Sequence, residues 1–161
     1  FCALASVGPE GIDCSPRGDD GRVVEVVDET TLVMPDRNGN NRIDTLRNIV
    51  RDPRVSLMFL IPGSGTVIRV IGKARITADA DVRAAYAKDG KEPRTVVFVF
   101  VDEVYFQCAR AVMRSQLWHG GHADPASLPT PGAILQAMTQ HGIDGAQYDT
   151  EWPERARASL W

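Results

Sequence analysis

The chain has 161 residues, of which 43% are hydrophobic and 24% are charged, and its net charge at pH 7 is −3. This length favours a single domain, and the composition is typical of a globular protein. The chain has no excess of basic residues with which to displace counterions, which argues against a general nucleic-acid or anionic-membrane binder. It contains no signal-peptide pattern and no apolar segment long enough to span a bilayer.

Cys2, Cys14 and Cys108 are the cysteines, and none of them stands in a CxxC pair. An odd count with this spacing argues against a disulfide framework or a zinc site and favours a reducing cytoplasm. A single bridge between Cys2 and Cys14, across the first hairpin, stays open. The sequence starts at Phe1, already inside a strand-like pattern, so we expect the natural protein to extend further at its N-terminus.

Short segments rich in β-branched and aromatic residues, separated by turn formers, predict strands. We expect them over residues 2–7, 12–17, 23–27, 31–34, 55–61, 66–77, 95–101 and 104–108. The segment 55–61 is almost continuously apolar, which predicts burial on both faces. The hairpin connections predict a meander, with the strands neighbouring each other in sequence order and helices inserted between them.

Four helices are predicted. The first follows Asn41, its expected N-cap, with Asp44 as capping-box partner, and ends at the Asp52-Pro53 pair. Its buried face is expected to comprise Ile43, Leu46, Ile49 and Val50. Further helices are expected over residues 79–88, 109–117 and from 130 to Gly142, followed by a turn at Trp152-Pro153. Antiparallel strands with such helices predict a mainly β, α+β fold, a small barrel with peripheral helices.

Residues 35–42 form a polar cluster with two arginines, three asparagines and a glycine. A helix N-terminus offers free N–H groups and a partial positive charge, so with Arg37 and Arg42 it predicts a phosphate site. Asn40 and Asn41 could add amide donors. An arginine in the first helical turn opposes the helix dipole, and a bound anion would remove that conflict. The alternative is a capped surface helix with solvated arginines.

Two further arginines are candidate ligands. Arg17 precedes a glycine that would let the backbone approach a ligand, although it could instead pair with Asp19 or Asp20. Arg69 stands between apolar neighbours, where a charge is costly unless it is paired or exposed. The alternative for Arg69 is an edge strand that faces water.

No catalytic side chain is predicted. His119 and His122 lie in a glycine-rich loop without a third ligand nearby in the sequence, so no metal site is assigned. His141 suits a helix C-terminus. Cys14 and Cys108 have no partner that would indicate thiol catalysis. The chain shows no Ser-His-Asp arrangement, P-loop or GxGxxG loop.

Several motifs, in order and spacing, resemble the pyridoxamine 5′-phosphate oxidase-like, FMN-binding split-barrel superfamily. The similarity is greatest to a branch with SPRGD and PDR-GNNR motifs rather than to the pyridoxamine phosphate oxidases themselves. The matching segments are residues 3–7, 15–19, 35–42, 52–57, 69–74, 105–111, 114–115 and 117–118. They extend over residues 1–118, so the resemblance implies one split-barrel domain over residues 1–161, with 119–161 as a helical C-terminal extension.

The resemblance implies a homodimer with FMN at the subunit interface. Strand residues 67–69 would flank the isoalloxazine, with Phe106 and Gln107 as the aromatic-glutamine pair. Arg114, Ser115 and Trp118 could clamp a flavin edge or a partner subunit, although Trp118 could equally be a core residue. The implied cofactor-binding residues are Ser15, Arg17, Asp19, Arg37, Asn40, Asn41, Arg42, Arg69, Arg114, Ser115 and Trp118.

The implied function is that of a cytoplasmic FMN-dependent oxidoreductase with an unknown substrate. Its chemistry would be the flavin's, so the absence of a protein nucleophile is consistent with it. The alternative is a non-enzymatic module that carries flavin or haem, and a deazaflavin is a third option. Residues 119–161 lack the basic arrangement with which the true oxidases hold their substrate's phosphate, so pyridoxamine phosphate oxidation is not predicted.

Overall fold

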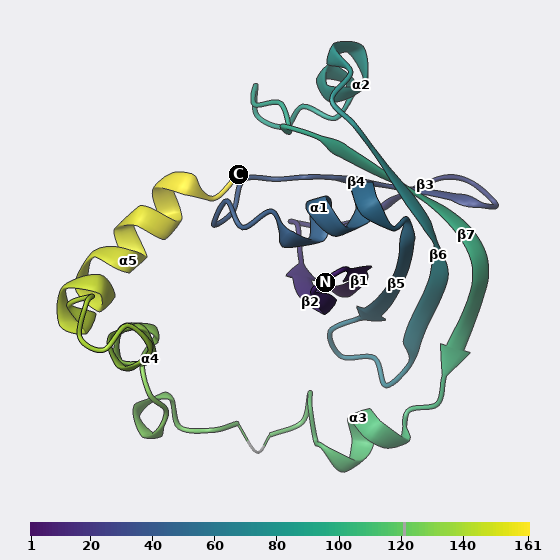
Figure 1. Ribbon diagram of the computed structural model, residues 1–161. Helices are drawn as coiled ribbons and strands as arrows, with labels where there is room; N and C mark the ends of the chain where they lie inside the picture. The colour runs from purple at the N-terminus through teal and green to yellow at the C-terminus, as the bar shows by residue number, and fades with distance from the viewer. Residues whose placement is uncertain (121) are drawn as a thin grey trace. The chain divides into compact units, whose positions relative to one another are not determined.

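Seven strands form one antiparallel sheet in the computed structural model, which describes residues 1–120 and 122–161 (Figure 1). The strands are β1 (Cys2–Gly8), β2 (Gly11–Arg17), β3 (Glu25–Asp28), β4 (Thr31–Pro35), β5 (Arg54–Leu60), β6 (Val67–Thr77) and β7 (Val96–Gln107). Their order is β2-β1-β5-β6-β7-β4-β3, and within the described chain no pairing closes β2 onto β3. This is the predicted α+β split barrel, with an open sheet.

The predicted meander is wrong. The local hairpins β1–β2, β3–β4 and β5–β6 form, but β1 pairs with β5 and β4 pairs with β7. Alternation of apolar residues predicts which face of a strand is buried, but it does not predict which strands pair along their edges. The meander was therefore predicted from the order of the strands in the sequence alone. The long-range pairings place β2 and β4, which are close in sequence, at distant positions in the sheet.

The predicted strands 95–101 and 104–108 are one strand, β7. The break expected at Asp102-Glu103 is a bulge: Ile71 pairs with Glu103 and Gly72 with Val101, which leaves Asp102 as the extra residue. A bulge bends a strand without ending it. In Figure 1, β6 and β7 are correspondingly long and curved.

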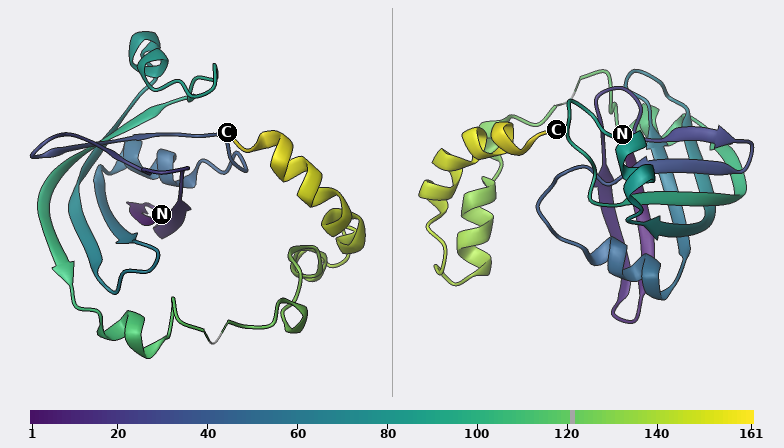
Figure 2. Two further views of the ribbon diagram at one scale, coloured as in Figure 1. Left: turned by 180° about the vertical axis from the view of Figure 1, so that it is seen from behind. Right: turned by 90° about the horizontal axis from the view of Figure 1, so that it is seen from above.

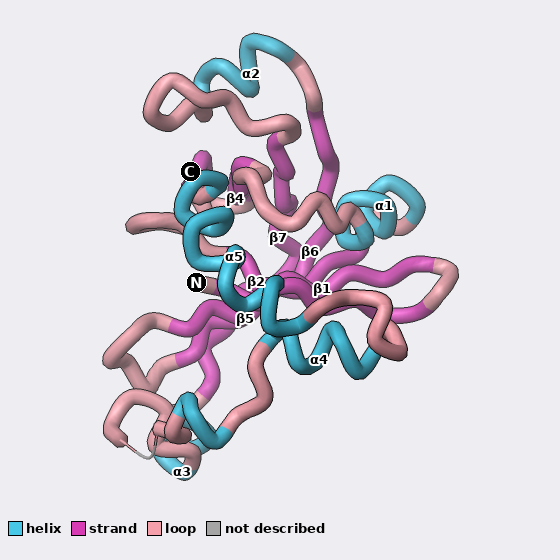
Figure 3. Tube along the Cα trace, turned by 90° about the vertical axis from the view of Figure 1, so that its left-hand side faces the viewer, coloured by secondary structure: helices cyan, strands magenta, loops and turns pink. Residues whose placement is uncertain are grey.

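The helices are α1 (Asp44–Arg51), α2 (Ala80–Ala85), α3 (Arg110–Arg114), the 3-10 helix η1 (Pro125–Ser127), α4 (Pro131–Met138) and α5 (Gly145–Ser159). Along the β6–β7 pair, α2 and α3 lie at opposite ends (Figure 3). The turn expected at Trp152-Pro153 is wrong, because α5 continues through Pro153. Its N-cap Asp144 accepts a hydrogen bond from the Gln147 N–H, which sequence reasoning overlooked.

Helix α1 begins later than predicted and buries a different face. Its N-cap is Ile43 rather than Asn41, whose φ of 58° is left-handed. The buried residues are Thr45, Asn48 and Ile49, whereas Ile43 and Val50 are 52% and 76% exposed. Residues on β1 and β2 form hydrogen bonds with Thr45 and Asn48, the two buried polar side chains. Hydrophobic periodicity does not predict such bonds.

The core lies between α1 and the inner face of the sheet, and α1 packs along β1 (Figure 2). Its members are mainly aliphatic: Cys2, Leu4, Leu32, Met34, Ile49, Val55, Leu57, Val70, Ala74, Val97 and Val99. Burial raises the pKa of the Cys2 thiol to about 11, so this thiol stays protonated at neutral pH. Cys2 is paired in register with Arg17 and Cys14 with Ala5, and all three cysteines are free, so the Cys2–Cys14 bridge does not form.

Residues 1–119 with Trp161 make one compact unit, and residues 120–160 make another. In the second unit α4 and α5 meet at two glycines, where a Cβ on Gly132 would lie 2.0 Å from the Gly145 carbonyl oxygen. The Gly132 N–H donates to Asp149 Oδ1 at 2.8 Å, and the Gly145 N–H to Gln136 Oε1 at 3.1 Å. The hairpin is thus held by close backbone approach and polar capping.

No helix within residues 1–120 and 122–161 combines the length and the apolar character needed to cross a membrane.

Gly72 provides a test of the bulge. A Cβ there would lie 2.1 Å from the Phe100 carbonyl oxygen, which belongs to the backbone and cannot rotate away. We expect Gly72→Ala to lower the free energy of unfolding by about 2 kcal/mol or more, measured by urea denaturation. Gly18→Ala is the matched control, because its Cβ would meet only Phe1 at 3.8 Å. Equal stability of the two variants would contradict the packing described for Gly72.

Candidate functional site

Two crossed ion pairs connect the end of β2 to the end of β4. Arg17 Nη1 lies 3.1 Å from Asp36 Oδ1, and Arg37 Nε lies 3.0 Å from Asp19 Oδ2. Four strands separate β2 from β4 in the sheet order, so these pairs bridge the open side of the barrel. All four side chains are at most 23% exposed, so salt screens these pairs less than it screens solvated surface pairs.

Asp19 is the centre of a larger cluster. Its Oδ1 accepts hydrogen bonds from Lys88 Nζ at 2.8 Å and from the Asp20 N–H at 2.7 Å. Arg37 also donates from Nη1 to the Tyr86 carbonyl oxygen at 2.9 Å. Burial alone would raise the pKa of Asp19, but the bonds from Lys88, Arg37 and the Asp20 N–H outweigh it and hold the pKa below its ordinary value of 3.8.

We call the two ion pairs, Arg17–Asp36 and Arg37–Asp19, the seam. A groove of about 260 Å³ lies beside it. Four arginines and one aspartate line it together with the polar loop: Arg17, Asp36, Arg37, Asn38, Gly39, Asn40, Asn41, Arg42 and Arg94. The excess of positive charge and of N–H donors suits an oxyanion. An adjoining cavity of about 150 Å³ includes Asp19 in its lining.

Arg17, which lines this groove, has one hydrogen-bond donor without an acceptor in the described chain. Its Nε is buried and has no hydrogen-bond partner among the residues that the structure describes. A buried donor without an acceptor costs about 1–3 kcal/mol.

The loop before α1 is shaped by its asparagines. Asn40 Oδ1 accepts from the Arg42 N–H at 3.0 Å, and Asn41 Oδ1 accepts from Arg94 Nη1 at 3.2 Å. Since these oxygens are engaged, an anion would be bound by the NH2 groups. Arg42 is 79% exposed and pairs with Asp44 at 2.7 Å. It precedes the helix, so its predicted place in the first helical turn is wrong.

The family model of pyridoxamine 5′-phosphate oxidase matches residues 1–108. The chain belongs to the pyridoxamine 5′-phosphate oxidase-like family. The match contains β1 to β7 and all of the groove residues named above. It ends before α3 and the second unit.

Solved structures show the same fold. HupZ of Group A Streptococcus is 18% identical, with 76% of this chain and 89% of HupZ covered and a TM-score of 0.53. A candidate pyridoxamine 5′-phosphate oxidase of Lactobacillus delbrueckii is 24% identical, with 65% of this chain and 82% of that chain covered and a TM-score of 0.51. At these identities the likeness concerns the fold alone. A search of curated proteins finds no match.

Six of the predicted site residues lie around the seam and the groove: Arg17, Asp19, Arg37, Asn40, Asn41 and Arg42. The other predicted residues lie outside the groove. Ser15 Oγ donates to Asp13 Oδ2 at 3.1 Å and accepts from Thr45 Oγ1 at 3.1 Å. Thr45 itself donates to Asp13 at 2.8 Å. Ser15 thus belongs to the network that anchors α1 to β2, and its contact with a cofactor stays a prediction.

Arg69 lies on β6, between β5 and β7, so the edge-strand alternative is wrong. Its guanidinium is 5.1 Å from the centre of the Tyr105 ring, a cation–π distance. Trp118 Nε1 donates to the Ser64 carbonyl oxygen at 2.7 Å, and Ser115 Oγ to the Val112 carbonyl oxygen at 3.1 Å. These residues and the exposed Arg114 do not line the groove, and their cofactor contacts remain predictions.

Sequence reasoning missed Arg94, Thr95 and Lys88. The Asp36 N–H donates to the Thr95 carbonyl oxygen at 2.9 Å, and this bond brings Arg94 beside the polar loop. The available signal was the basic series Lys88, Lys91 and Arg94 just before a strand. This basic series is far from residues 35–42 in the sequence, so its proximity to the polar loop could not be predicted.

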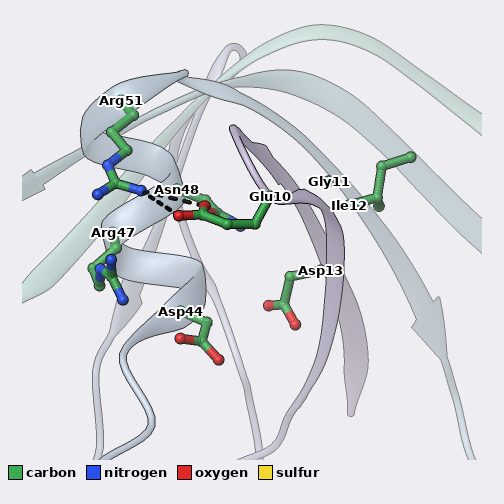
Figure 4. A pocket seen from close by; sticks show the side chains of 8 residues that line it. All are labelled: Glu10, Gly11, Ile12, Asp13, Asp44, Arg47, Asn48 and Arg51. Atoms are coloured by element: carbon green, nitrogen blue, oxygen red, sulfur yellow. Dashed lines mark hydrogen bonds and ion pairs between the residues drawn. The ribbon is translucent and has the colours of Figure 1, made fainter.

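A second cavity, of about 250 Å³, lies between the β1–β2 hairpin and α1 (Figure 4). Across it Arg51 Nη1 lies 3.3 Å from Glu10 Oε2. The lining holds three acidic residues and two arginines, so it offers no excess positive charge. Within residues 1–120 and 122–161 no three His, Cys, Asp or Glu side chains come together as a metal site.

The Asp19 cluster can be tested by removing its charge. We expect Asp19→Asn to lower the free energy of unfolding at pH 7 by about 2 kcal/mol, because Arg37 and Lys88 lose their anion. Since the pKa of Asp19 is depressed in the folded protein, its contribution is complete above about pH 4 and is lost as the pH falls through the folded pKa.

Urea denaturation from pH 3 to pH 7 would measure both effects. Glu10→Gln is the control, because the Arg51–Glu10 pair is exposed and should change stability by about 0.5 kcal/mol or less. An Asp19→Asn variant that keeps the full acid sensitivity of the natural chain would contradict the assignment.

Proposed function

We propose that this chain is an FMN-binding oxidoreductase whose groove holds the FMN phosphate. The observation that carries the proposal is the buried, unpartnered Arg17 Nε in a groove lined by four arginines. A phosphate offers several charged acceptor oxygens to such donors. The site suggested by helix-terminus chemistry and the one implied by the family resemblance meet at this same loop.

The residues fit the phosphate of FMN. Arg17 would donate from Nε, Arg42 and Arg94 would add charge at the mouth, and Asn40 and Asn41 would add amide donors. Asp36 fixes Arg17 through Nη1 and so orders its guanidinium before a ligand arrives, which lowers the entropic cost of binding. Bound FMN would supply hydride and single-electron transfer, while these side chains bind and orient it.

We further propose that a second copy completes the site. The groove, at about 260 Å³, is smaller than most cofactor pockets. Val104 and Phe106 are 63% and 73% exposed, although they pair in register with Val70 and Ile68 and so share the face of the buried core. Burying such apolar side chains would favour association, in agreement with the homodimer implied by the resemblance.

The visible spectrum of the purified chain tests the cofactor. We expect two flavin bands and the release of FMN on denaturation. Bleaching by a nicotinamide cofactor, with turnover of an acceptor, would support the enzyme over a carrier. A Soret band would show that the chain binds haem instead of FMN. A colourless protein that takes up no added FMN would contradict the proposal.

Arg17→Lys separates the phosphate contact from charge alone, because lysine keeps the charge and lacks Nε. We expect FMN binding to weaken by about 10-fold to 100-fold, measured by quenching of flavin fluorescence. Riboflavin, which has no phosphate, should bind both proteins equally. Arg51→Lys, in the second cavity, is the control and should leave FMN binding unchanged. Equal FMN affinity of the natural chain and Arg17→Lys would count against the phosphate site.

Phe106→Asp tests the dimer. A charge on this exposed apolar position should convert a dimer to a monomer in light scattering coupled to size exclusion, because the charge would be buried on association. FMN affinity should fall in parallel. Val26→Asp, at a site of comparable exposure (67%) on β3, is the control. A Phe106→Asp variant that remains dimeric would exclude this face as the interface.

A further inference from the structure

We propose that Trp161 is a ligand-contacting residue of the groove and selects ligands that carry a flat ring as well as a phosphate. The inference rests on the proposed function, since it concerns the same groove. It goes further in assigning a residue that lies outside the family match, which ends at residue 108.

The first observation is the position of the indole. Trp161 belongs to the same compact unit as the barrel and lines the groove together with Arg94 and Thr95. It is half-buried. The groove thereby has an aromatic surface close to its arginines.

The second observation is the charge around the ring. Lys91 Nζ lies 5.8 Å from the centre of the Trp161 ring, within cation–π range. Ile43 and Leu46 add apolar surface to the same groove. Cationic side chains therefore surround one aromatic and apolar patch, and this combination suits a ligand with both a phosphate and a ring.

The physical reason is that the two contacts favour different parts of a ligand. Arginines bind a phosphate with little regard to what it is attached to, whereas an indole stacks on any flat aromatic ring. A groove with both discriminates against inorganic phosphate and against sugar phosphates without a ring. Two ligands of a flavin enzyme share this chemistry: FMN itself and a nucleotide that donates electrons.

The test replaces the ring while keeping apolar volume. In Trp161→Leu we expect a loss of about tenfold in affinity for the ligand whose ring stacks there, and no change for ribose 5-phosphate, which lacks a ring. Trp161→Phe should recover part of the loss. Trp152→Leu, in α5, is the matched control and should bind every probe as the natural chain does.

Three titrations identify the source of the ring. Weaker FMN binding by apo Trp161→Leu assigns the ring to the flavin. Unchanged FMN binding with a raised dissociation constant for NADH, measured on the FMN-loaded protein, assigns it to the electron donor. Unchanged binding of both overturns the inference.

Failure of the proposed function gives a different result, because the natural chain would then bind no FMN. AMP, with a phosphate and an aromatic base, would in that case replace FMN as the probe. Equal affinity of the natural chain and Trp161→Leu for AMP would overturn the role of Trp161 independently of flavin.

Discussion

An open antiparallel barrel needs something other than strand pairing to hold its unpaired side together, and here two crossed ion pairs do so. Arg17–Asp36 and Arg37–Asp19 join strands that the sheet itself keeps far apart. Because the pairs are largely shielded from water, salt screens them less than surface pairs. The groove beside them depends on this constraint, since two of its four arginines are members of the pairs.

The same ion pairs explain why the arginines of the candidate site are held in place while one of their donors has no acceptor among the described residues. Asp36 and Asp19 engage one part of each guanidinium, and Arg17 Nε is left buried without an acceptor in the described chain. A site that is ordered in advance loses little entropy on binding and gains a charge-assisted hydrogen bond when an anion enters. Family membership makes FMN the natural candidate, although fold alone does not decide the chemistry.

Sequence reasoning worked best where chemistry was local. It singled out the SPRGD and PDR-GNNR segments, and six of the predicted side chains lie around the ion pairs and the groove; that they bind a cofactor stays a prediction. It failed where a distant partner decided the outcome. Thr45 and Asn48 are buried because Asp13 and Ser6 bond them, and Arg94 reaches the groove through a backbone bond between Asp36 and Thr95.

By itself the sequence determined the fold class, the family and the polar loop, because strand alternation, turn formers and short motifs are properties of neighbouring residues. Only the tertiary structure decided the strand order, the single curved β7 and the pairing of residues 17 and 19 with residues 36 and 37. It also placed Trp161 beside the groove. These features depend on contacts between segments far apart in the chain, for which one sequence provides no periodicity.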